Sequence, residues 1–190
     1  MRNVLSGILI LIAVGALASR RLERPQTAVE VEAAGRRQDG QRDAGATMII
    51  PVAGVQASQL KSTFNEGRAG HLHHAIDILA PRGTPVLAAV DGTVRKLFVS
   101  GAGGITLYEF DEAGERSYYY AHLDGYAAGV REGLVVRRGD VLGYVGTTGN
   151  APATTPHLHF AIEVLPPTKE WWKGEAIDPY PILKVASTLR

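Results

Sequence analysis

The sequence predicts a mainly β fold, an antiparallel sheet or sandwich, on three observations. Short runs rich in β-branched and aromatic residues recur from about residue 84 onward. Glycine and aspartate separate these runs at intervals typical of tight turns. Helix signals are few, and residues 57–64 are the best candidate for a short helix. No internal repeat is visible, so one sheet-based domain is the simplest architecture.

The expected strands follow in order along the chain. The Asp91-Gly92 dipeptide predicts that the two runs beside it form an antiparallel hairpin. Residues 111–115 predict the turn between the next two strands, and Gly139-Asp140 predicts a further turn. The predicted strands are residues 48–51, 84–90, 93–99, 105–110, 117–122, 141–145 and 157–165, with a short extended segment at Val135.

The composition limits both the size of the core and the chemistry available. A chain of 190 residues with 45% hydrophobic content can build one ordinary core. The 20 basic and 19 acidic residues nearly cancel to a net charge of +1, so nothing favours nucleic-acid binding. Cysteine is absent, which excludes disulfides and thiolate ligands. Any metal must therefore be bound by histidine, aspartate or glutamate.

The first 18 residues have the layout of an export signal. Arg2 precedes a run of apolar residues shorter than the roughly 20 that a comfortable membrane span requires, and Ala16-x-Ala18 offers a cleavage site. The alternative is a retained membrane anchor. Residues 19–46 lack aromatic residues and read as a flexible linker, and residues 47–190 form the folded domain. Either reading places this domain in the cell envelope, in the periplasm or outside the cell.

The histidines carry the chemistry. His157 and His159 flank Leu158 in a predicted strand, so both imidazoles point to one face of the sheet. Upstream, His73 is followed four residues later by Asp77. Two imidazoles and one carboxylate would bind zinc and leave a fourth position open for water, as in catalytic zinc sites. Strand periodicity alone cannot decide which of His157 and His159 would bind the metal.

Other catalytic arrangements have weaker support. The serines at positions 58, 62, 100 and 117 lack a nucleophile-elbow motif. A glycosidase pair would have to come from Glu109, Asp111, Glu112 and Glu115, which we expect to be solvated turn charges. His71 and His74 are expected to be ordinary surface residues.

A longer series of spaced elements closely resembles the lysostaphin/LytM-type zinc metalloendopeptidases, over about residues 48–183. The elements that carry the resemblance are His73-His74-Ala75-Ile76-Asp77-Ile78, Gly83-Thr84-Pro85-Val86, Asp91-Gly92-Thr93-Val94, Tyr120-Ala121-His122-Leu123 and His157-Leu158-His159-Phe160.

The resemblance implies roles for five residues. His73, Asp77 and His159 correspond to the zinc ligands, and His122 and His157 correspond to the pair that flanks the attacking water. It also implies that residues 47–190 are a zinc metallopeptidase domain whose substrate is a peptidoglycan peptide. One departure is Ala75, where the family usually has glycine. A second function stays open, a catalytically inactive scaffold of the same fold that binds wall peptide or regulates a partner hydrolase.

Overall fold

The computed structural model describes residues 48–68 and 70–186. The predicted export segment, residues 1–18, and the predicted linker, residues 19–46, lie outside the described residues. None of the helices in the described part is both long enough and apolar enough to cross a membrane.

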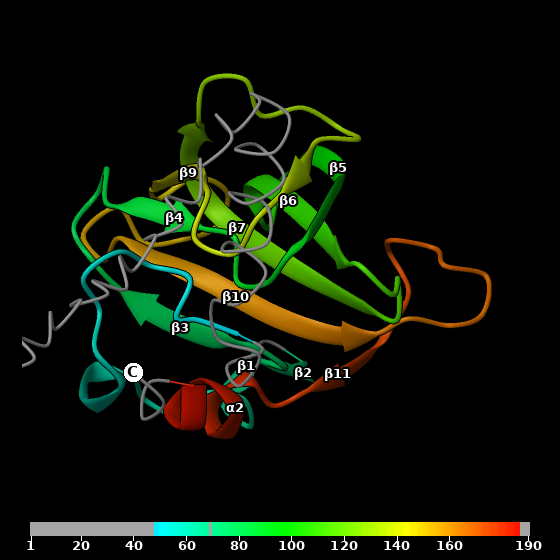
Figure 1. The fold of residues 1–190 in the computed structure, drawn as a ribbon. Coiled ribbons are helices and arrows are strands. Elements are labelled where there is room, and N and C mark those ends of the chain that lie inside the picture. The colour runs from blue at the N-terminus through cyan, green and yellow to red at the C-terminus, as the bar shows by residue number, and fades with distance from the viewer. Residues whose placement is uncertain (1–47, 69, 187–190) are drawn as a thin grey trace, which may run out of the picture. The chain divides into compact units, whose positions relative to one another are not determined.

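The fold is built around one nine-stranded sheet in which every paired neighbour is antiparallel, which confirms the predicted fold class. Strand β10 is central: Figure 1 shows it beside β7 on one side and β3 on the other. The main path of the sheet is β11 (Glu175–Ile177), β10 (His157–Val164), β7 (Arg116–Tyr126), β6 (Gly104–Asp111), β5 (Gly92–Ser100) and β8 (Val135–Val136). Off this path, β3 (Ile76–Leu79) pairs with β10, and β4 (Pro85–Leu87) pairs with β9 (Val141–Val145), which also pairs with β7.

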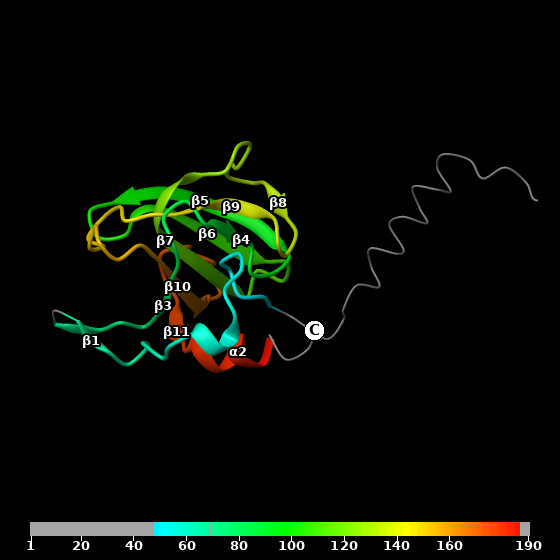
Figure 2. The same cartoon turned by 90° about the vertical axis from the view of Figure 1, so that its left-hand side faces the viewer.

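Three smaller elements complete the domain. Strands β1 (Gly67–Arg68) and β2 (His71–Leu72) form a separate two-stranded hairpin, which projects away from the body of the domain (Figure 2). The 3₁₀ turn η1 (Ala57–Gln59) and the helix α2 (Pro179–Ala186) contact each other, and α2 also contacts β10.

Side chains along the central strands point alternately into the hydrophobic core and to the opposite face of the sheet. On β10, Leu158, Phe160 and Ile162 are fully buried, and the Phe160 ring packs 5.2 Å from that of Tyr120 on β7. On β3, Ile76 contributes to the same core. Successive residues of a strand point to opposite sides of the sheet, so the residues that alternate with these core residues lie on the other face.

Several predicted elements are wrong in detail. Residues 48–51 do not form a strand: Ile49 N donates to Ala89 O, Pro51 O accepts from Leu87 N, and the following residue, Val52, forms an isolated bridge with Val86. Pro51 has no N–H to donate, so a regular ladder cannot continue through it. Of the helix expected over residues 57–64, only η1 forms, because Leu60 is already extended.

The hairpin expected at Asp91-Gly92 is also wrong. Strand β4 ends at Leu87 and pairs with β9, whereas β5 pairs with β6 and β8. A Cβ added to Gly92 would lie 2.2 Å from the backbone oxygen of Phe110. This glycine is therefore required by close approach of two strands and not by a two-residue turn.

Glu109 is not a solvated turn charge. It lies within β6 with none of its surface exposed, and the Tyr120 hydroxyl donates to its Oε2. The same hydroxyl accepts a hydrogen bond from Ala89 N at 2.9 Å. Glu109 thus belongs to a buried polar network that links β6, β7 and the segment after β4.

Candidate functional site

The pairing of β3 with β10 sets the first part of the site. In this register Asp77 lies directly opposite His159, and Leu79 lies opposite His157. Their neighbours Ile78 and Leu158 point into the core. Asp77, His157 and His159 therefore project from one face of the sheet, as the alternation of strand side chains predicts.

His73 reaches the same place from the segment between β2 and β3. Its backbone N–H donates to Glu66 O at 2.9 Å, and its Nδ1 lies 3.1 Å from Thr63 O. The next residue, His74, has a φ of 53°, which turns the chain so that the two neighbouring imidazoles point apart. His74 is exposed and packs with its ring 5.4 Å from that of Phe64. Its surface position agrees with the prediction.

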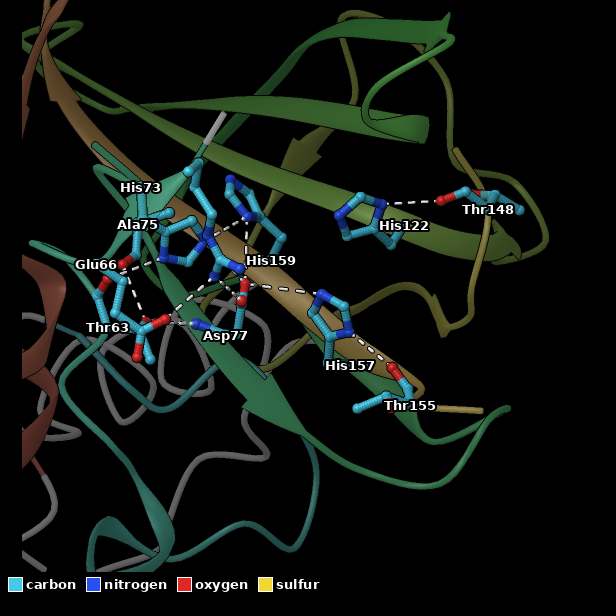
Figure 3. Close-up of polar contacts among 11 residues, drawn as sticks. Thr63, Glu66, His73, Ala75, Asp77, His122, Thr148, Thr155, His157 and His159 are labelled. Carbon is cyan, nitrogen blue, oxygen red and sulfur yellow. Dashed lines mark hydrogen bonds and ion pairs between the residues drawn. The ribbon is translucent and has the colours of Figure 1, made fainter. Parts of the chain in front are cut away.

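Three candidate ligand atoms converge (Figure 3). His73 Nε2 lies 3.0 Å from His159 Nδ1 and 3.1 Å from Asp77 Oδ1, and His159 Nδ1 lies 3.2 Å from Asp77 Oδ1. Ligand atoms held tetrahedrally at the roughly 2.0–2.2 Å typical of zinc lie about 3.3–3.6 Å apart. The observed separations are within a few tenths of an ångström of this spacing.

The protonation of the cluster also fits a metal. A carbonyl oxygen can only accept, so the proton of a neutral His73 is on Nδ1 and Nε2 carries a lone pair. Asp77 Oδ1 is buried and receives no hydrogen bond from the described residues. Burial would raise the pKa of Asp77, but the neighbouring His159 and His73 hold it well below its usual range. With the proton of His73 on Nδ1, the lone pair of Nε2 faces the carboxylate oxygen Asp77 Oδ1, and a bound cation would stabilise this arrangement.

The outer contacts of Asp77 orient its carboxylate. Arg68 Nη2 donates to Oδ2 at 2.8 Å, which leaves Oδ1 directed toward the two imidazoles. The hydroxyl of buried Thr63 accepts from Asp77 N and donates to Ala75 O, while its backbone oxygen faces His73. Thr63 and Arg68 were missed by sequence reasoning, because their link to the site depends on a loop and a hairpin that carry no motif.

His122 and His157 form the second half of the site. Each ring directs Nδ1 at a backbone oxygen 2.8 Å away, Thr148 O for His122 and Thr155 O for His157 (Figure 3). Each neutral ring therefore carries its proton on Nδ1 and has a lone pair on Nε2. The two ring centroids are 5.0 Å apart, and His157 Nε2 lies 3.7 Å from Asp77 Oδ1.

An irregularity in β7 aims the His122 ring. The register between β6 and β7 shifts between Ile105 and Leu107, so that β7 carries an extra residue there, and His122 has a φ of 60°. Such bulges redirect a side chain and are common beside functional sites. Burial lowers the pKa of His122 to about 4, so the ring is neutral at pH 7.

All five predicted residues line one cavity of about 630 Å³. Tyr119 and Arg68 contribute to its wall. Ala75, the departure from the family pattern, is buried and its φ lies outside the left-handed region. The unusual backbone angle falls on His74 instead, so the Ala75 methyl group requires no strained conformation.

Comparisons with known proteins identify the family of this chain. The family described as Peptidase family M23 matches residues 71–179. An L-Ala–D-Glu endopeptidase of Bacillus subtilis is 32% identical over 132 residues, 65% of this chain and 39% of that protein. The glycyl-glycine endopeptidase ALE-1 of Staphylococcus capitis is 35% identical over 123 residues, 63% of this chain and 31% of that protein. The matched part is therefore less than half of either curated relative.

A solved structure gives the same result. The catalytic domain of the antimicrobial peptidase lysostaphin from Staphylococcus simulans superposes with a TM-score of 0.56 at 30% identity, covering 67% of this chain and 95% of that domain. The predicted resemblance is confirmed: the chain belongs to peptidase family M23, a family of metallopeptidases, and has the lysostaphin/LytM fold.

Proposed function

We propose that this chain is a zinc-dependent endopeptidase that hydrolyses peptide cross-links of bacterial peptidoglycan in the cell envelope. The observation that carries the proposal is the convergence of His73 Nε2, Asp77 Oδ1 and His159 Nδ1 beside two further imidazoles with fixed tautomers. The names of the relatives, which include an L-Ala–D-Glu and a glycyl-glycine endopeptidase, support a wall peptide as the substrate.

The proposed ligands are His73, Asp77 and His159. Zinc, when bound there, supplies a Lewis acid that polarises the attacked carbonyl and makes water nucleophilic near neutral pH. A carboxylate and two neutral imidazoles form a donor set typical of such sites. Arg68 and Thr63 hold Asp77, and the Thr63 carbonyl fixes the tautomer of His73, as outer partners of metal ligands commonly do.

His122 and His157 supply the proton chemistry. Their Nε2 lone pairs accept hydrogen bonds from the attacking water, and one of the two rings takes up the proton that the water loses. The N–H group formed in this way donates to the oxyanion and then gives the proton to the leaving amine. A ring can take up this proton only if it is neutral at the start of the reaction. The low pKa of buried His122 meets this condition.

Digestion of isolated peptidoglycan tests the proposal. Purified residues 47–190 are expected to release peptide fragments that mass spectrometry identifies by the new amino and carboxyl ends. A chelator should stop the release, and added zinc should restore it. The inactive-scaffold alternative predicts binding to the wall without any fragments in the presence of zinc.

A further inference from the structure

Arg68 has hydrogen-bonding capacity that the protein does not use. Its Nη2 donates to Asp77 Oδ2 at 2.8 Å and lies 3.4 Å from exposed Glu66 Oε2. The second contact is long and solvated, and such pairs contribute little. Within the described part of the chain, the Nε and Nη1 groups of Arg68 have no partner. The side chain is 40% exposed and lies in the wall of the cavity.

The charge of the cavity wall favours an anion. Apart from imidazoles, the described residues that line the cavity include only two charged side chains, Arg68 and Asp77. These two charges are paired with each other. A divalent ion on the ligand cluster would make the wall net positive, and no lysine or glutamate in the lining changes this balance. An anionic group on a bound peptide would therefore meet favourable charge.

A guanidinium group suits a carboxylate in particular. Its N–H groups lie in one plane with fixed directions, and charge-assisted hydrogen bonds to carboxylates are the stronger kind. Because Asp77 fixes Nη2, the guanidinium is already oriented before a ligand arrives, and less side-chain freedom is lost on binding.

We propose that Arg68 determines substrate specificity by binding a carboxylate of the wall peptide, and so selects acidic peptides over neutral ones. This inference rests on the proposed function and narrows its substrate class. It places the chain with relatives that act on a bond beside an acidic residue, such as the L-Ala–D-Glu endopeptidase, and not with those that act on glycyl-glycine bonds.

The test compares two end-blocked peptides that contain an L-Ala–D-Glu bond. One keeps the glutamate carboxylate free, and the other carries it as an amide. Their affinities for the zinc-loaded protein are measured by calorimetry, and kcat and KM are measured for each peptide. We expect the wild-type protein to bind the acid at least about tenfold more tightly than the amide, which is the scale of a hydrogen bond to a charged group.

The variant Arg68→Gln should lose this preference. At saturating zinc, which offsets any loss of metal affinity, affinity for the acid falls by about tenfold or more, whereas affinity for the amide stays the same. Arg68→Lys keeps the charge but not the planar donors, so it should keep part of the preference. The matched control is Arg82→Gln, since Arg82 pairs with Asp124 on the surface and lies outside the cavity lining. This control should behave as the wild-type protein does.

Arg68 could act by binding the substrate or only by orienting Asp77. Zinc affinity, measured by competition with a coloured chelator, distinguishes these two roles. An equal loss for acid and amide in Arg68→Gln, with weaker zinc binding, would overturn the inference. So would a wild-type protein that binds both peptides equally or binds neither. Selective binding of the acid without cleavage would leave the inference standing and contradict the proposed endopeptidase function.

Discussion

Asp77 and His159 face each other across two antiparallel strands, with Oδ1 of one 3.2 Å from Nδ1 of the other. Residues 82 positions apart are thus held by backbone hydrogen bonds between β3 and β10 and not by a flexible loop. His73 joins them through a turn that Thr63 holds. Two of the three proposed ligands are therefore rigidly positioned before any metal binds.

Asp77→Asn should abolish zinc binding at the site. The amide oxygen is neutral, so the variant loses the one negative charge among the proposed ligands. We expect zinc affinity to fall by more than the roughly 10–100-fold that follows loss of an outer partner. Dialysis followed by metal analysis measures the effect. Asp124→Asn is the control, because Asp124 pairs with Arg82 outside the cavity. Unchanged zinc content in Asp77→Asn would refute the assignment of Asp77 as a zinc ligand.

His122→Ala and His157→Ala should separate catalysis from metal binding. Neither ring belongs to the proposed ligand set, so zinc content should stay at the wild-type level. Turnover should fall by about 10²–10⁴-fold, the usual contribution of a positioned acid or base. The control is His74→Asn, because His74 is exposed and asparagine tolerates its φ of 53°. If either alanine variant kept full activity, its histidine would have no part in proton transfer.

Thr148 connects the fold to the site and gives a third prediction. Its hydroxyl accepts from Ile105 N and donates to Leu123 O, while its backbone oxygen accepts from His122. Thr148→Val leaves two part-buried backbone groups unpaired and should reduce the free energy of unfolding by about 1–3 kcal/mol. It should also lower kcat while zinc affinity stays constant.

Thr148→Ser is the matched variant for this position, because it keeps the hydroxyl and removes only a methyl group. Urea unfolding and steady-state kinetics of both variants decide the point. Equal stability and equal kcat for valine and serine would mean that the hydroxyl does not support the bulge at His122.

Glu109 predicts how stability depends on pH. Burial raises its pKa from 4.5 in the unfolded chain to about 8 in the folded protein. Between these values the folded state holds the proton more tightly, so the contribution of Glu109 is full below about pH 4.5 and is lost as pH rises toward 8. Glu109→Gln stays neutral and should remove this loss.

Urea unfolding of the wild-type protein and Glu109→Gln at several pH values between 5 and 9 measures the effect. The difference between the two stability curves isolates Glu109 from other titrating groups, His122 among them. A difference that does not change with pH would show that Glu109 is ionised in the folded protein at neutral pH.

The sequence predicted the parts of the site that depend on local spacing. His157 and His159 share a face because strand side chains alternate, and the four-residue spacing from His73 to Asp77 pointed to two of the proposed ligands. The choice between His73 and His74 depended on the family resemblance. The structure places only His73 in the cluster, through the backbone angle of His74.

Features that depend on contacts between distant segments could not be predicted in this way. Strand β4 pairs with β9, which lies far from it in the sequence, although Asp91-Gly92 looked like an ordinary turn. The buried position of Glu109 depends on the Tyr120 hydroxyl from a neighbouring strand. Arg68 reaches Asp77 only because the short β1–β2 hairpin forms, and two-residue strands leave no periodic pattern.

The central claim is that zinc binds to the cluster of His73, Asp77 and His159. It is tested most directly with crystals of the zinc-loaded protein, by collecting diffraction data on both sides of the zinc absorption edge. We predict one strong anomalous peak within about 2.0–2.2 Å of His73 Nε2, Asp77 Oδ1 and His159 Nδ1. A fourth position on the ion should open toward His122 and His157. A zinc ion bound elsewhere, or a cluster that stays free of metal at saturating zinc, would contradict the proposed metal site.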